Sequence, residues 1–297
     1  ANGSYPFVPP AKGQELEGVF SLRTMNDLER IQEYLAGVES VAVVGGGLLG
    51  LEAAWAIHEL GKKVHIIEFA PYLMNRQLDE PLARELQNML AEKDMTMYLG
   101  AGASEIMGDN KVQRILLTDS RELEAQAILY SCGIRSNIKL FQGTPLNVER
   151  GVVVNSRLET SIFDVYAAGD VAQTNGITLG LWTAGMAQGK IAGANMAGDD
   201  NIYDLEMPST LFQINDWKIF STGKVSGELE TLESGLDNGK VKLFFNKGIL
   251  QGGVLMNDSQ WIPFLKKAVK KEPDCHRWVN GQISAVGILE RLKEQMN

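Results

Sequence analysis

The segment SVAVVGGGLLG, residues 40–50, decides the fold. Its first five residues form a short apolar run rich in valine, which is typical of a buried strand. The glycines that follow have the spacing Gly-x-Gly-x-x-Gly at Gly45, Gly47 and Gly50. Residues 51–60 then predict a helix, and KVHIIE at 63–68 predicts a second strand. Strand, glycine turn, helix and strand within about thirty residues indicate a βαβ unit of an α/β fold.

The glycine turn is matched by an acidic residue, Glu68, which ends the second predicted strand about 20 residues on. In a dinucleotide site, the first glycine permits the tight turn, the second admits the pyrophosphate and the third lets the helix approach the strand. The start of the helix offers free N–H groups and the positive end of its dipole to phosphate. A Glu68 carboxylate favours a ribose 2′-OH over a 2′-phosphate, which predicts NADH rather than NADPH. The alternative is a purely structural turn with Glu68 as a solvated strand end.

The composition is that of an ordinary globular protein, with 44% hydrophobic residues, 22% charged residues and a net charge of −9 over 297 residues. This acidic balance argues against a nucleic-acid partner, whose phosphates would require a basic excess. The longest apolar stretch, 41–57, contains Glu52 and several glycines and makes a poor membrane span. Cys132 and Cys275 lie far apart without Cys-x-x-Cys spacing, which favours a reduced, cytoplasmic setting.

The chain length allows about two domains. After the first βαβ unit, Asp79 and Pro81 mark the start of another helix. Further strands are predicted at 95–99, 112–118, 127–132, 152–154 and 165–168. A long helix from Leu181 to Ala197 follows. Beyond residue 200 the pattern changes to strands followed by two helices, 261–271 and 284–296, which indicates an α+β arrangement.

A second glycine-rich signal follows the predicted strand at 165–168, which ends in Gly169 and Asp170. In the helix that comes next, glycine recurs every four residues and leaves one face bare: Gly185, Gly189 and Gly193. Glycine costs about 1 kcal/mol at each interior helical position, so another interaction must offset it. Close packing of the helix on a sheet and close approach of a flat ligand are equally good explanations.

Four blocks of the sequence carry a detailed resemblance. They are ANGSYP at 1–6, the glycine turn with Glu68, CGIRSN at 132–137 and YAAGD at 166–170. Together they resemble the pyridine-nucleotide-linked flavoprotein reductases, which include NADH:rubredoxin reductases, ferredoxin reductases, NADH oxidases and the flavin part of NADH-dependent nitrite reductase. LMNRQLD at 73–79 favours the rubredoxin-reductase and nitrite-reductase branch. The resemblance covers residues 1 to about 200.

This resemblance implies an α/β fold in which a Rossmann-type NAD-binding domain, 21–145, is inserted in a partial FAD-binding domain, 1–20 and 146–198. A smaller α+β C-terminal domain, 199–297, follows. Members of the family have another Gly-x-Gly-x-x-Gly upstream of the ANGSYP block for the FAD diphosphate. The chain is therefore expected to be a fragment that holds FAD weakly or not at all. A purified chain that is yellow and stoichiometrically flavinated would contradict this expectation.

The resemblance also implies roles for individual residues. The NADH site would consist of Gly45, Gly47, Leu48, Leu49, Gly50 and Glu68, with Gly133 lining the cleft. Glu52 would lie beside the nicotinamide as the catalytic residue, although it is equally explained as an acid in the first helical turn. FAD would be bound by Gly169 and Asp170, and the start of the next helix would face the flavin pyrimidine at Trp182 and Thr183.

The function implied is that of an NADH-dependent FAD oxidoreductase, in which FAD takes a hydride from NADH and passes electrons to a redox partner such as rubredoxin or to another redox domain. No metal site is expected, because His58, His65 and His276 lack ligand spacing. Cys132 is interpreted as a core thiol and Cys275 beside His276 as incidental. An NADH oxidase or disulfide reductase of the same fold, and a flavin-free NAD-binding or sensing module, remain as alternatives.

Overall fold

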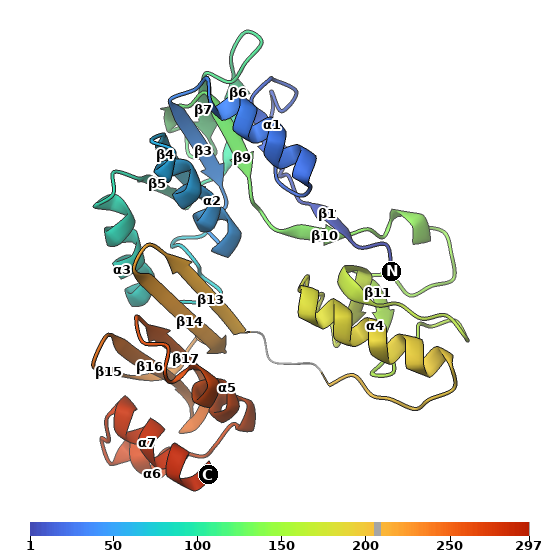
Figure 1. The fold of residues 1–297 in the computed structure, drawn as a ribbon, viewed down its shortest axis with the longest axis vertical. Coiled ribbons are helices and arrows are strands. Elements are labelled where there is room, and N and C mark those ends of the chain that lie inside the picture. Colours follow the sequence, from blue (N-terminus) through green and yellow to red (C-terminus); the bar gives the residue numbers. More distant parts are fainter. Residues whose placement is uncertain (205–208, 297) are drawn as a thin grey trace. The chain divides into compact units, whose positions relative to one another are not determined.

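The computed structural model describes residues 1–204 and 209–296 and divides the chain into two units (Figure 1). The first unit combines Ala1–Pro9, Ser21–Glu29 and Cys132–Glu206. The second combines Pro10–Phe20, Arg30–Ser131 and Met207–Asn297. The chain passes from one unit to the other within helix α1 (Met25–Leu35). Segments that are far apart in sequence therefore fold together in both units.

A five-stranded sheet forms the centre of the second unit, with strand order β2 (Val19–Ser21), β9 (Ala127–Tyr130), β3 (Ser40–Val44), β4 (Lys63–Glu68) and β5 (Thr96–Leu99). Strand β3 pairs in parallel with β4 on one side and β9 on the other. Its last four residues are buried, as expected for a strand covered on both faces. Helix α2 (Leu48–Glu59) connects β3 to β4 and confirms the predicted βαβ unit.

Helix α3 (Glu80–Ala91) begins where the sequence predicts. Asp79 is its N-cap, its Oδ1 accepts a hydrogen bond from the Leu82 amide at 3.3 Å, and Pro81 occupies the first turn. The apolar face of α3 is buried in the core at Leu82, Leu86 and Leu90. A separate antiparallel sheet follows β5 and consists of β6 (Ala103–Met107), β7 (Arg114–Leu117) and β8 (Glu122–Glu124).

His65 on β4 is a buried histidine, 4% exposed, and neither ring nitrogen has a hydrogen-bond partner among the described residues. Burial and, to a smaller extent, the charge of Lys63 lower its pKa. The unfolded chain therefore binds a proton at this side chain more readily than the folded chain does.

We expect the free energy of unfolding to decrease as the pH falls below about 6.5, the usual histidine pKa. The variant His65→Phe should lose this part of the pH dependence, because it has no proton to bind on unfolding. Urea denaturation at several pH values measures the effect, with His58→Phe as the control, since His58 is only half-buried. An unchanged pH dependence in His65→Phe would contradict the expectation.

The C-terminal part of the second unit contains a five-stranded antiparallel sheet, in the order β13 (Ser209–Ile214), β14 (Trp217–Gly223), β17 (Ile249–Met256), β16 (Lys240–Asn246) and β15 (Glu230–Gly235). Lys247 and Gly248 both have positive φ and form the hairpin turn between the paired residues Asn246 and Ile249. Strand β15 is not predicted from the sequence. The helices are α5 (Ile262–Lys271), α6 (His276–Asn280) and α7 (Ala285–Met296) (Figure 1).

The two faces of this C-terminal sheet pack against different elements. Leu243 and Phe245 belong to a buried cluster with Leu265 of α5 and Leu289 of α7. Phe244, between them in β16, belongs instead to the cluster that includes α2 and α3. This alternation follows the period of two in a strand, and it buries both faces of the sheet.

The first unit contains two small strand pairs and one long helix. Strand β1 (Ser4–Pro6) pairs with β10 (Ile134–Ser136) in antiparallel, and β11 (Val152–Val154) pairs with β12 (Ala172–Thr174) in parallel. Short 3₁₀ turns lie at η1 (Lys139–Phe141) and η2 (Gly169–Val171), and helix α4 spans Trp182–Met196. The predicted strand at 165–168 is wrong. This segment makes a single bridge, between Tyr166 and Glu159, and then enters η2.

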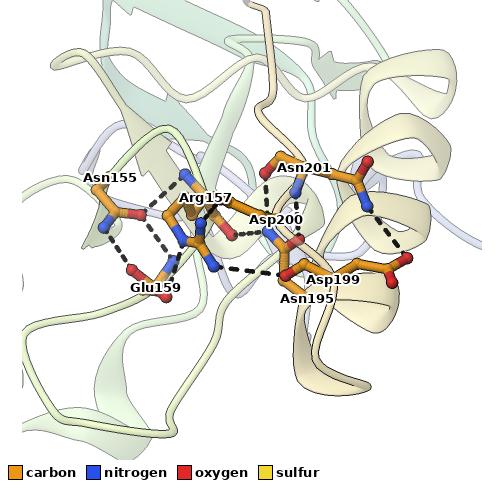
Figure 2. Close-up of polar contacts among 7 residues, drawn as sticks. All are labelled: Asn155, Arg157, Glu159, Asn195, Asp199, Asp200 and Asn201. Atoms are coloured by element: carbon orange, nitrogen blue, oxygen red, sulfur yellow. Dashed lines mark hydrogen bonds and ion pairs between the residues drawn. The ribbon is translucent and has the colours of Figure 1, made fainter.

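A polar network holds the C-terminal end of α4 to the loop after β11 (Figure 2). The buried Asn195 donates to the carbonyls of Arg157 and Asn201, both at 2.9 Å, and accepts from the Asn201 amide at 2.7 Å. Arg157 pairs with Glu159 at 3.1 Å and also with Asp200. The buried Asn195 amide is thus satisfied by main-chain partners from both segments, and the half-buried Arg157 adds ion pairs around it.

Candidate functional site

Two of the three glycines of the Gly-x-Gly-x-x-Gly motif, Gly45 and Gly50, are required by the backbone itself. Gly45 has φ +121°, a conformation that side chains disfavour, and its amide donates to the Ile67 carbonyl at 2.8 Å. A Cβ at Gly50 would lie 2.9 Å from the Gly45 carbonyl carbon and closer still to its oxygen. The turn between β3 and α2 therefore closes only with glycine at these positions.

The middle glycine, Gly47, has no such requirement. Its φ is −84°, which any residue adopts, and no atom lies within 4 Å of an added Cβ. Gly47 is also the N-cap of α2, and it has no side chain with which to cap the helix. The start of α2 at Leu48 and Leu49 therefore follows a bare backbone, with open space where a Gly47 side chain would lie and with Leu49 66% exposed. This arrangement suits an anion that must approach the main chain closely.

Helix α2 begins at Leu48 and not at Leu51, which corrects the predicted start. The last residues of the glycine motif are therefore helical. As a result, Glu52 lies beyond the first turn, which contains no acidic residue, and the interpretation of Glu52 as a first-turn acid is wrong. Its side chain is exposed, and partial desolvation raises its pKa. The placement of Glu52 beside a nicotinamide stays a prediction.

The structure brings Glu68 to the glycine turn. One carboxylate oxygen accepts a hydrogen bond from the Gly46 amide at 2.5 Å, and the other accepts from the Ala70 amide at 2.7 Å. Each oxygen retains a further lone pair, so the carboxylate can hold the turn and still accept bonds from a ligand hydroxyl. Glu68 is half-buried, which keeps one side of it open to solvent.

Residues that the sequence reasoning did not single out complete the surroundings of the turn. Ser131 follows β9, its amide donates to the Val44 carbonyl at 2.7 Å, and its Cβ lies 3.5 Å from a Cβ built at Gly50. Met74 has φ +50° and donates to the Gly46 carbonyl at 2.9 Å. Met74 lies in the LMNRQLD block, which indicates a branch of the family but does not predict this left-handed conformation. A methionine gives no sequence signal for that conformation.

Gly133 and Cys132 belong to the first unit, whereas the glycine turn belongs to the second. Gly133 has φ +83°, and its carbonyl accepts from the Phe7 amide at 2.8 Å, so it serves the chain connection into β10. Its role in lining an NAD cleft stays a prediction. Cys132 lies after the end of β9 and is half-buried, which corrects its interpretation as a core thiol.

In the first unit, Asp170 joins several segments. Its Oδ2 accepts a hydrogen bond from Ser4 at 2.6 Å and pairs with Arg23 at 3.4 Å, and its carbonyl accepts from the Ser136 hydroxyl at 2.7 Å. The adjacent Gly169 has φ +80°, and no atom lies within 4 Å of an added Cβ. The sequence blocks at 1–6, 132–137 and 166–170 thus meet at one residue, Asp170, through its carboxylate and its main-chain carbonyl.

The start of α4 lies beside Gly169. A Cβ added at Gly185 would sit 3.7 Å from the Gly169 Cα, and the Gly169 amide donates to Gln188 Oε1 at 2.8 Å. Thr183 is exposed and Trp182 is 83% exposed, and no side chain caps the helix. Added Cβ atoms at Gly189 and Gly193 would meet no atom within 4 Å, so among the described residues these two glycines do not pack on a sheet.

Other groups in the described part of the chain offer less chemistry. Cys275 is buried, and this burial together with Asp274 raises its pKa to about 11, so the thiolate is disfavoured. No group of three or more metal-ligating side chains occurs among the described residues. Every helix within 1–204 and 209–296 is too short or too polar to cross a bilayer.

Comparison with known proteins gives consistent matches. Residues 1–190 match the model of the pyridine nucleotide-disulphide oxidoreductase family. Nitrite reductase [NAD(P)H] of Bacillus subtilis is 32% identical over 300 residues, covering 99% of this chain and 37% of that protein. NADH-rubredoxin oxidoreductase of Clostridium acetobutylicum is 27% identical, covering 84% of this chain and 63% of that protein. The chain thus spans only part of these relatives.

Among solved structures, a NAD-dependent persulfide reductase from A. fulgidus superposes with a TM-score of 0.86 at 23% identity, covering 94% of this chain and 57% of that one. This likeness confirms the α/β fold. The family match extends over more than half of the chain and includes all four blocks on which the resemblance rests. The chain belongs to the pyridine nucleotide-disulphide oxidoreductase family.

Proposed function

We propose that this chain binds NADH at the turn between β3 and α2 and is the nucleotide-binding part of an NADH-dependent FAD oxidoreductase. The observation that carries the proposal is the geometry of Gly47, which the fold does not require to be glycine and which leaves the N-terminus of α2 bare. Glu68, bonded to the same turn, supplies a carboxylate where the adenosine ribose would lie. Family membership supports this reading of the site.

The first unit fits part of a flavin site. Gly169 leaves space that a Cβ would fill, Asp170 offers a carboxylate for hydroxyl groups, and the uncapped start of α4 favours negative charge. Bound FAD would supply hydride acceptance from NADH and electron transfer onward. The residues Gly169, Asp170, Trp182 and Thr183 would bind and orient this group, and Glu52 would lie on the nicotinamide side.

The electron acceptor is proposed to be a redox protein such as rubredoxin or a further redox domain. Two relatives support this choice, since their names specify rubredoxin in one case and nitrite in the other. A reducing, cytoplasmic setting is part of the same proposal and rests on the two widely separated cysteines, which lack Cys-x-x-Cys spacing. Anaerobic addition of NADH to the flavin-containing protein tests the redox function. Loss of visible flavin absorbance supports it, whereas a protein that binds NADH and never contains flavin would indicate an NAD-binding module.

Glu68 is expected to determine the nucleotide preference of this site. The chain should bind NADH more tightly than NADPH, because the Glu68 carboxylate accepts bonds from a 2′-hydroxyl and repels a 2′-phosphate. Glu68→Ala should weaken NADH binding by about tenfold or more, as expected for loss of a hydrogen bond to a charged group, and should reduce the discrimination against NADPH. Fluorescence titration with both nucleotides measures the two affinities.

Glu68→Gln is the control for this variant. It keeps an oxygen that can accept the Gly46 amide but removes the negative charge, so it separates support of the turn from repulsion of phosphate. We expect Glu68→Gln to retain more NADH affinity than Glu68→Ala while losing most of the discrimination. A preference for NADH that is unchanged in both variants would exclude Glu68 as the selecting residue.

A further inference from the structure

A buried ion pair joins the C-terminal sheet to the start of α3. Lys242, on β16, has a side chain only 8% exposed, and its Nζ lies 2.6 Å from Asp79 Oδ2. Glu233 of β15 contributes a second carboxylate at 3.6 Å. A buried lysine needs such partners, because removing its charge from water is costly. Asp79, the nearer of the two carboxylates, is also the N-cap of α3.

A second pair lies further along the same helix. Lys240 bonds Glu85 of α3 and also Glu233, the latter at 2.9 Å. Burial opposes the charge of Lys240, but the two carboxylates outweigh burial and raise its pKa. Lys240 thus attaches the C-terminal sheet to the middle of α3, whereas Lys242 attaches it to the helix start. Variants of Lys240 and Lys242 therefore allow attachment at the middle of α3 to be compared with attachment at its start.

The segment 70–78 connects the glycine turn at 45–50 to the start of α3. The Leu78 amide donates to the Met74 carbonyl, and the Met74 amide donates to the Gly46 carbonyl, both at 2.9 Å. Leu73, fully buried, would meet a Cβ at Gly46, and its amide donates to Gln87 of α3 at 3.2 Å. The peptide around Gly46 is thereby held by Glu68 on one side and by this segment on the other.

Apolar packing makes the same connection. Phe212, Phe244 and Met256 of the C-terminal sheet share one buried cluster with Leu51 of α2, Leu73 and Leu82. Such a shared core transmits small displacements, because a close-packed interior has few voids in which to absorb them. Displacement of the C-terminal sheet therefore reaches the glycine turn through both packing and polar contacts.

We propose that the C-terminal sheet supports the glycine turn at 45–50. Lys242 is then a positioning residue for the nucleotide, and it acts through Asp79, the segment 70–78 and Gly46. The inference rests on the proposed NADH site and assigns to residues 209–256 a part in nucleotide affinity. Without Lys242, the partly buried Asp79 carboxylate loses its nearest charged partner, and the start of α3 is held less firmly. The segment 70–78 then loses its fixed end, and the Gly46 peptide is no longer held in the orientation that serves the ligand.

The test compares Lys242→Met with Lys240→Met in the whole chain. We expect Lys242→Met to weaken NADH binding by about fivefold, the middle of the range for changes transmitted through packed networks. Lys240→Met should change NADH affinity by less than about twofold, since Asp79 keeps its partner. Lys242→Arg, which restores the charge, should recover most of the affinity. In the double variant Lys242→Met with Asp79→Asn, the neutral cap should also recover part of it.

Amide hydrogen exchange of the nucleotide-free chain provides a readout that does not depend on the ligand. Lys242→Met should accelerate exchange in peptides covering 44–50 and 70–78, and Lys240→Met should not. Equal NADH affinity and equal exchange in both lysine variants would overturn the inference while leaving the NADH site intact. Failure of the unchanged chain to bind NADH would overturn the proposed function, and the exchange rates alone would then decide whether Lys242 holds the turn.

Discussion

Gly47→Ala is expected to abolish most NADH binding without unfolding the chain. An alanine methyl group at this position meets no protein atom within 4 Å and suits the observed φ of −84°, so the fold itself tolerates it. The methyl group does, however, occupy the space through which a diphosphate would reach the amides of Leu48 and Leu49. Loss of two hydrogen bonds to a charged group, each contributing about 1.5 kcal/mol, corresponds to roughly a hundredfold weaker binding.

Titration of NADH fluorescence gives the affinity, and urea denaturation of the same sample shows that the fold is retained. A suitable control is Gly189→Ala, in the first unit, because its added methyl group also enters open space but lies far from the turn in sequence. Gly189→Ala should leave NADH binding unchanged. Undiminished NADH affinity in Gly47→Ala would show that the nucleotide does not approach this backbone, and it would remove the main support for the site.

Much of the glycine turn is predictable from the sequence because the residues that form it lie close together in the chain. The strand at 40–44, the glycine spacing and the acid at 68 follow one another within a single βαβ unit, and each has a fixed geometric reason. Asp79 and Pro81 likewise mark the start of α3, since capping depends on adjacent residues. Local signals of this kind can be recognised in the sequence without knowledge of the tertiary structure.

The features that the sequence does not reveal depend on distant segments. The pairing of Lys242 with Asp79 joins β16 to the start of α3, and the left-handed Met74 bonds the carbonyl of Gly46, far back in the chain. The predicted strand at 165–168 fails for a related reason. An apolar run without a partner strand makes one bridge and then turns into η2. The periodicity of apolar residues indicates which positions are buried. Whether the segment is a strand depends on a partner strand, which can be distant in the sequence.

The glycines in this chain have different structural roles, even within one turn. Gly45 and Gly50 are required by the backbone, whereas Gly47, Gly189 and Gly193 leave open space. A count of glycines, or their spacing alone, does not separate these classes, because the difference lies in what an added Cβ would meet.

Gly50→Ala is expected to have the opposite effect to Gly47→Ala and to destabilise the second unit severely. Its methyl group would lie 2.9 Å from the Gly45 carbonyl carbon, and backbone atoms cannot move aside as a flexible side chain can. Helix α2 would have to separate from β3, which disrupts packing against Ser131 and the core around Leu51. Overpacking of this kind costs about 3 kcal/mol, a large fraction of the stability of an ordinary domain. The midpoint of urea denaturation should therefore fall far more than in Gly47→Ala. A Gly50→Ala chain as stable as the unchanged protein would mean that α2 does not pack on the turn as closely as its geometry requires.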